Sequence, residues 1–309
     1  MPGFLSPDDF AFGSQRRREE SGGEMQSNIA RLLRQRGHEV TREGSRHDIM
    51  LPENDDEELV SAFETVLYNL MRRDSARKAL RDWAYRNNSS DNSAIQQIES
   101  YITLCRRFGD WTSQSDAENQ KRYAATFEWY VSELLKREFA ARASGFGIRL
   151  KDADPDDEFD CIALLDAGLA YVECKTGKGT LYGEIAKFTR RDSEICANVS
   201  LFVFDRDYTF DKGETDAPRI SGEQANALGL ESISKIRVRG EEFFEIVGVN
   251  RRSDAEDEEI DTRFFLACTA FRGFESRVRY MIRYSSETQE EGRPLSNIFS
   301  LSPMPFAED

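Results

Sequence analysis

Three charged residues lie within two otherwise apolar stretches in the middle of the chain. Asp160 begins one stretch, and Glu173 and Lys175 end the next. The intervening Asp-Ala-Gly at 166–168 favours a tight turn, because glycine adopts a positive φ there. A hairpin about this turn sets Asp160 across from Glu173, to within one register step. Glu173 and Lys175 are two positions apart on one strand, so their side chains share a face.

This grouping predicts a metal site. Burying two neighbouring carboxylates is costly unless a cation compensates their charge. Oxygen ligands from Asp160, Glu173 and the backbone carbonyl of Cys174 favour Mg²⁺ or Mn²⁺. Lys175 is then expected beside the metal-bound water, where it orients the water or stabilises negative charge in the transition state. A different strand register would offer two other ligands, Asp156 and Asp157.

The motif Asp160 followed by Glu173-Cys174-Lys175 resembles the active site of the PD-(D/E)xK nuclease superfamily. In that superfamily a carboxylate is followed, after about ten to twenty residues, by Asp or Glu, any residue, and Lys on the next strand. The Glu-Cys-Lys-Thr at 173–176 is most similar to the Mrr-like and CRISPR-ancillary nuclease branch. One departure is that Pro155 precedes Asp156 rather than Asp160. Among the nine lysines of the chain, Lys175 alone has an acid two positions before it.

The resemblance also implies a fold and a fourth site residue. The superfamily core runs helix, three strands, helix and strand, and residues 118–204 follow that order across less than a third of the chain. Its first helix often contributes an acidic ligand to the metal or its water. Glu128 stands at the corresponding place, with Glu133 as the alternative. Together these features imply a Mg²⁺- or Mn²⁺-dependent endonuclease.

Basic residues after the second apolar stretch are candidates for nucleic-acid contacts. Lys178 lies in the glycine-rich turn at 177–180, which lacks the first glycine and the spacing of a Walker A phosphate-binding loop. We interpret it as a flexible turn that lets the backbone approach a substrate phosphate. The helix expected from Tyr182 to Cys196 carries three more basic residues, on a face that either contacts the nucleic-acid backbone or is simply solvated: Lys187, Arg190 and Arg191.

A second basic cluster precedes the predicted nuclease core. At helical spacing it lines a nucleic-acid groove in one interpretation. In the other, its members are surface residues paired with a neighbouring acidic helix. The cluster consists of Arg72, Arg73, Arg77, Lys78, Arg81 and Arg86.

The order of elements predicts an α/β protein with a restriction-endonuclease-like mixed sheet flanked by helices. Residues 1–115 are expected to form a mainly helical regulatory or interaction region, with a mobile arm at 1–24 and a strand-turn-strand unit at 38–51. Residues 116–309 are expected to form the nuclease-like domain, which begins with a helix at about 118–142 and ends in a β-rich extension. Its strands are predicted at 148–150, 159–165, 169–175, 199–204, 233–238, 243–249, 264–271 and 278–284.

Residue counts exclude several other kinds of site. The chain has 2 histidines, too few for a Ser-His-Asp triad, an HD phosphohydrolase or a multi-histidine zinc site. Its 5 cysteines form no C-x-x-C pair, which argues against a zinc ribbon and a disulfide framework and favours a cytoplasmic location. The sequence contains no 18-residue apolar run and no apparent signal peptide, so no membrane association is expected.

The resemblance implies a hydrolase that cuts DNA, with RNA as the less favoured substrate, and a role as a prokaryotic antiviral defence effector. The alternative is an inactive nuclease-fold module that binds nucleic acid or assembles a complex. We expect a homo-oligomer or a complex with a partner protein such as an ATPase. The net charge of −15 repels a polyanion. The isolated protein is therefore expected to bind nucleic acid weakly, through local arginine patches and bound metal.

Overall fold

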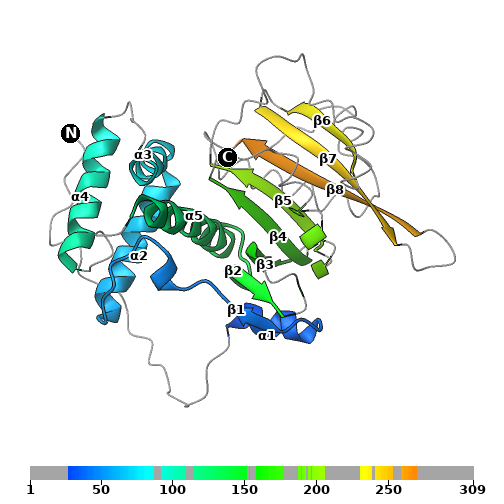
Figure 1. Ribbon diagram of the computed structural model, residues 1–309, viewed down its shortest axis with the longest axis horizontal. Helices are drawn as coiled ribbons and strands as arrows, with labels where there is room; N and C mark the ends of the chain where they lie inside the picture. Colours follow the sequence, from blue (N-terminus) through cyan, green and yellow to red (C-terminus); the bar gives the residue numbers. More distant parts are fainter. Residues whose placement is uncertain are drawn as a thin grey trace.

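The protein is an eight-stranded mixed sheet with helices on both faces, as a computed structural model shows (Figure 1). The strand order is β1-β2-β3-β4-β5-β8-β7-β6. Neighbouring strands from β1 to β4 are antiparallel, β5 runs parallel to both β4 and β8, and β8, β7 and β6 are antiparallel. The predicted mixed α/β class is therefore confirmed. The strands are β1 (Val40–Arg42), β2 (Ala143–Leu150), β3 (Phe159–Leu165), β4 (Gly168–Lys175), β5 (Val199–Phe204), β6 (Leu230–Val238), β7 (Glu241–Arg252) and β8 (Glu259–Thr269).

The structure describes residues 27–86, 92–108, 115–151, 153, 158–166, 168–176, 187–188, 190–192, 194–195, 197–205, 230–238, 241–252 and 259–269. The predicted arm at 1–24 and the predicted strand at 278–284 lie outside this part of the chain. Within it, no helix is long and apolar enough to cross a membrane.

Most of the helices belong to the N-terminal half. Asp56 caps α2 by accepting hydrogen bonds from the backbone N–H groups of Glu58 and Leu59. Arg73, with a ψ of 115°, has an extended backbone conformation that separates α2 from α3. Further helical residues occur between 187 and 195. The helices are α1 (Asn28–Gln35), the 3₁₀ helix η2 (Arg46–Asp48), α2 (Glu57–Arg72), α3 (Asp74–Ala84), α4 (Asn92–Phe108) and α5 (Asp116–Glu138).

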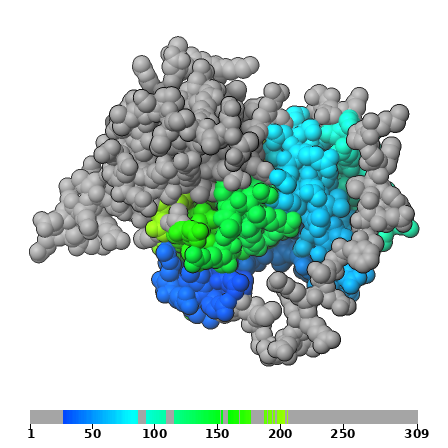
Figure 2. Space-filling view, turned by 180° about the vertical axis from the view of Figure 1, so that it is seen from behind, coloured from blue at the N-terminus to red at the C-terminus, as the bar shows by residue number. Residues whose placement is uncertain are grey.

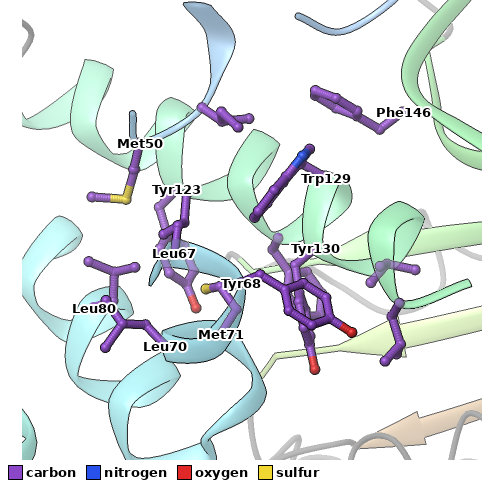
Figure 3. Packing of buried hydrophobic residues seen from close by; sticks show 14 of the residues in the cluster. Met50, Leu67, Tyr68, Leu70, Met71, Leu80, Tyr123, Trp129, Tyr130 and Phe146 are labelled. Atoms are coloured by element: carbon purple, nitrogen blue, oxygen red, sulfur yellow. The ribbon is translucent and has the colours of Figure 1, made fainter. Parts of the chain in front are cut away.

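Two apolar clusters cover the two faces of the sheet. The larger joins α2, α3, α4 and α5 to one face, and Figure 3 shows its centre, where Leu67 and Met71 of α2 lie near Tyr123 and Tyr130 of α5. The smaller joins α1 and Phe188 to the other face. In Figure 2 the blue and cyan N-terminal residues lie directly against the green residues of the centre. The N-terminal helices and the sheet thus share one core, and the predicted boundary at 115/116 stays a prediction.

Two local predictions need correction. The expected strand-turn-strand unit at 38–51 contains one strand, β1, followed by η2, because Asp48 accepts hydrogen bonds from the backbone N–H and hydroxyl of Ser45 and closes a 3₁₀ turn. The helix expected to reach Arg142 ends at Glu138. Ala140 has a φ of 54°, a left-handed conformation that cannot continue a helix, and β2 starts three residues later.

Candidate active site

The strands β3 and β4 bring the predicted residues together. Their register pairs Cys161 with Val172, and one further step sets Asp160 opposite Glu173. This confirms the predicted pairing to within one register step. Lys175 ends β4, two residues beyond Glu173, and its side chain is 24 % exposed, whereas that of Glu173 is completely buried.

The start of β3 departs from regular alternation. Phe159 and Cys161 are two apart, yet Phe159 packs on Tyr171 in the smaller cluster and Cys161 belongs to the larger one. On the other side of β3, Gly147 of β2 faces Asp160 with a φ of 56°, a conformation that favours glycine. This irregularity accompanies the turn of the Asp160 carboxylate toward β4, where Oδ2 accepts a hydrogen bond from the Cys174 backbone N–H at 2.8 Å.

Lys175 lies between the two carboxylates. Its Nζ is 2.5 Å from Oε1 of Glu173 and 3.7 Å from Oδ2 of Asp160. The three side chains therefore form one charged group at the end of two paired strands. The positive charge of one ammonium group thus lies close to both carboxylates.

Glu173 has two further partners, which the sequence analysis did not identify in this role. The Tyr171 hydroxyl donates a hydrogen bond to Oε2. The Arg191 guanidinium donates to both oxygens, at 3.0 and 3.1 Å. Tyr171 stands two residues before Glu173, so strand alternation alone places it on the same face. Arg191 has no such local signal, since it lies on a separate element.

The basic residues predicted to contact nucleic acid are placed differently from one another. Lys187 and Arg190 are exposed. Arg191 is not on the surface where the sequence placed it, because its side chain is 8 % exposed and pairs with Glu173. Lys178 lies outside the described residues.

Glu128 of α5 belongs to the same electrostatic environment. Its side chain is partly buried. Burial, followed by the negative charges of Asp160 and Glu158, raises the pKa of Glu128 well above its usual range. Burial and the charge of Glu173 likewise raise the pKa of Asp160 to about 7. Acids crowded in this way are stabilised by a cation.

The alternative residue on α5, Glu133, is already paired. Its carboxylate lies 2.9 Å from Nζ of Lys136 and 3.0 Å from Nε of Arg137, both on the same helix. The charge of Glu133 is therefore already balanced by two residues of its own helix. The other alternative ligands, Asp156 and Asp157, lie outside the described residues.

The donor chemistry suits a hard divalent cation. Asp160 and Glu173 offer carboxylate oxygens next to the Cys174 carbonyl. Burial raises the pKa of the Cys161 thiol to about 12 and that of Cys174 well above its usual value, so neither thiol is a thiolate ligand at neutral pH. Within the described ranges, no three His, Cys, Asp or Glu residues are grouped closely enough to hold a metal. A bound ion would therefore rely on two carboxylates, the carbonyl and water, and the place of Glu128 in its ligand set stays a prediction.

Most residues of the basic cluster near α3 form ion pairs within the protein. Lys78 pairs with Asp82 at 2.8 Å. Arg77 and Arg81 are buried rather than exposed, and Arg77 pairs with Asp74 and Asp205. The second interpretation expected ion pairs, but with a neighbouring helix; Asp74 and Asp82 lie on α3 itself, and the two buried arginines are not surface residues. Arg72 and Arg86 also have acidic partners, Glu138 and Asp116.

Comparison with known proteins finds remote structural likenesses. No protein-family model and no curated protein sequence matches the chain. Protein VC1899 from Vibrio cholerae has a TM-score of 0.38 and 12 % identity, over 65 % of this chain and 56 % of that one. Can2 from Sulfobacillus thermosulfidooxidans, in complex with cyclic tetra-adenylate, has a TM-score of 0.34 and 16 % identity, over 59 % of this chain and 53 % of that one. The chain thus matches little more than half of either structure, and at such TM-scores neither likeness supports an inference about activity.

Proposed function

We propose that the chain is a metal-dependent nuclease that hydrolyses phosphodiester bonds, with DNA as the favoured substrate and RNA as the alternative. The observation that carries this proposal is the position of the Lys175 ammonium, 2.5 Å from Glu173 and 3.7 Å from Asp160. Two acids and a lysine at the end of paired strands match the chemical requirements of the PD-(D/E)xK arrangement.

Each residue has a distinct role in this proposal. Asp160, Glu173 and the Cys174 carbonyl hold Mg²⁺ or Mn²⁺. A bound ion of this kind supplies Lewis acidity and lowers the pKa of water. Lys175 provides positive charge where the phosphate gains negative charge. Glu128, on the neighbouring helix, accepts a proton from water or orients it.

A second candidate function is an inactive module of the same fold. It is favoured by one observation, namely that Glu173 already has Tyr171, Lys175 and Arg191 as partners. A carboxylate satisfied in this way needs no metal to compensate its charge. In this case the chain would bind nucleic acid or assemble a complex without cleaving.

Cleavage assays separate the two functions. Supercoiled plasmid, single-stranded DNA and RNA are each incubated with the protein in Mg²⁺ or Mn²⁺. We expect cleavage by the native chain and its loss in Glu173→Gln and Lys175→Ala. Lys151→Ala is the matched control, because Lys151 is exposed, pairs with Glu39 at 2.8 Å and has no role in the proposed site. Cleavage that persists in both site variants would exclude the proposed active site.

The proposal extends to a role in prokaryotic defence. The chain would act as a homo-oligomer or in a complex with a partner such as an ATPase. The net charge of −15 supports the need for a partner, because the acidic surface repels nucleic acid. We expect the isolated chain to bind DNA weakly in fluorescence anisotropy, with affinity falling steeply as salt is added. Tight, salt-insensitive binding by the isolated chain would contradict the need for a partner.

A further inference from the structure

Asp205 connects the N-terminal helices to the end of β4, the strand that carries Glu173 and Lys175. It is the residue directly after β5, and it is completely buried. Its backbone N–H donates a hydrogen bond to the carbonyl of Lys175 at 2.9 Å. The last residue of β4 is thus fixed by the first residue beyond β5. In Figure 1 the arrowheads of both strands point toward α3.

The Asp205 side chain is held from two helices. Arg77 of α3 donates from Nε to Oδ1 at 2.8 Å. Tyr123 of α5 donates from its hydroxyl to Oδ2. Arg81, one turn after Arg77, donates to the Asp205 backbone carbonyl. The residue therefore bonds α3 and α5 through its side chain and carbonyl, and Lys175 through its amide.

Arg77 is itself rigidly placed. It is fully buried, and its other nitrogens donate to the Met71 carbonyl and to the Asp74 carboxylate, each at 2.8 Å. Burial alone would lower the pKa of Arg77, but electrostatic interactions with Asp205, Tyr123 and Tyr130 and the hydrogen bond to Asp205 together outweigh this effect and raise it. The guanidinium is therefore charged, and each of its three nitrogens has a defined acceptor.

A second contact joins α3 to the same strand end. The Tyr85 hydroxyl, just after α3, lies 2.9 Å from the hydroxyl oxygen of Thr176. Thr176 follows Lys175 directly. The Tyr85 ring packs edge-on against Tyr123, with centroids 6.2 Å apart. Two hydrogen-bonded connections therefore end within one residue of Lys175.

We propose that Asp205 is a positioning residue for Lys175, held in place by Arg77 and Arg81. The proposal rests on the proposed function, since it treats Lys175 as the catalytic lysine. A buried ion pair contributes little net stability because desolvation offsets its attraction, so its effect lies in fixing geometry. Displacing a catalytic group by about 1 Å can cost about 100-fold in rate. The helices α3 and α5 are then part of the active-site framework, and a partner that moves α3 would change the activity.

Asp205→Asn tests this role, with Asp82→Asn as the matched control. Asp82 is also a buried carboxylate: it belongs to α3, pairs with Lys78 at 2.8 Å and lies 3.6 Å from Arg81. We expect Asp205→Asn to lower kcat by about 10- to 100-fold with an unchanged KM, and to speed hydrogen exchange of the amides at 172–176 and 203–205. The Asp82→Asn variant should change neither. Asp205→Glu, which retains the charge, should recover part of kcat.

Hydrogen exchange separates this inference from the proposed function. If the native chain cleaves no nucleic acid, the proposed function fails, and faster exchange at 172–176 in Asp205→Asn alone still supports the link to Lys175. Unchanged exchange and kcat in folded Asp205→Asn overturn the inference, as does an equal loss in Asp82→Asn. Should Asp205→Asn not fold, Tyr123→Phe removes one hydrogen bond to the same carboxylate and is expected to shift both readouts in the same direction; no shift overturns the inference.

Discussion

Arg191 places one guanidinium nitrogen 3.0 and 3.1 Å from the two carboxylate oxygens of Glu173. Both side chains are buried, and they lie 18 positions apart on different elements. The charge of Glu173 is thus neutralised by Arg191, one of the helical residues between 187 and 195, as well as by Lys175 of its own strand. This ion pair connects the packing of that segment to the candidate active site.

Replacing Arg191 should strongly destabilise the protein. Removing one partner of a buried ion pair typically costs about 3–5 kcal/mol, because the other charge stays buried. We expect Arg191→Met to lower the free energy of unfolding by about 3 kcal/mol in urea titrations. Arg190→Met, at an exposed neighbouring position, is the control and should have little effect. The double variant with Glu173→Gln should recover much of the loss, and failure to recover would show that the pair is not the cause.

The pKa of Asp160 predicts how stability changes with pH in the absence of metal. Burial and the charge of Glu173 raise it from the usual 3.8 to about 7. Between these values the folded protein holds a proton that the unfolded chain has released. The stabilising contribution is therefore complete below about pH 4 and is lost as pH rises through about 7.

The measurement is the free energy of unfolding in a metal chelator at several pH values. The contribution of Asp160 should fall from pH 4 to pH 7, and the Asp160→Asn variant should lack this decrease. The informative quantity is the difference between the two curves, since other acids titrate in both proteins. Parallel curves would show that Asp160 titrates near its usual pKa.

The pattern of strands was readable from the sequence because it is local. The bounds of β3 and β5 agree with the prediction, and the apolar runs on either side of Gly168 place β4 within one residue. The same alternation sets Glu173 and Lys175 on one face. Side-chain pairing across long sequence distances could not be read in this way. Asp205 lies in a polar stretch, and its partner Arg77 is 128 positions away.

The misassigned arginines have the same cause. On α3, Arg77 occurs among other basic residues and resembles a surface position, although it is completely buried. The acid that neutralises it, Asp205, is present in the sequence, but only the folded structure shows that the two side chains are in contact. Arg191 was misplaced for this reason as well, since its burial depends on how residues 187–195 pack against β4.

Cysteine reactivity provides an independent check of the core. In the described part of the chain, Cys105, Cys161 and Cys174 are buried and outside any disulfide bond. Burial raises the pKa of the Cys161 and Cys174 thiols, so little reactive thiolate exists at pH 8. We expect iodoacetamide to label both residues only after denaturation, as read by peptide mass spectrometry. Rapid labelling of either in the native protein would contradict the packing of β3 and β4.

Lys175 should oppose metal binding while it supports catalysis. Its ammonium lies within 4 Å of both candidate ligands, Asp160 and Glu173, so it repels a divalent cation placed between them. Even at the dielectric constant of water, two unit charges about 4 Å apart interact by about 1 kcal/mol, which corresponds to about fivefold in affinity. Lys175→Met is therefore expected to bind Mn²⁺ at least about fivefold more tightly in calorimetry while losing cleavage. Lys151→Met, which removes an exposed lysine, should bind Mn²⁺ like the native chain; weaker binding by Lys175→Met would show that the lysine helps to build the metal site instead of competing with it.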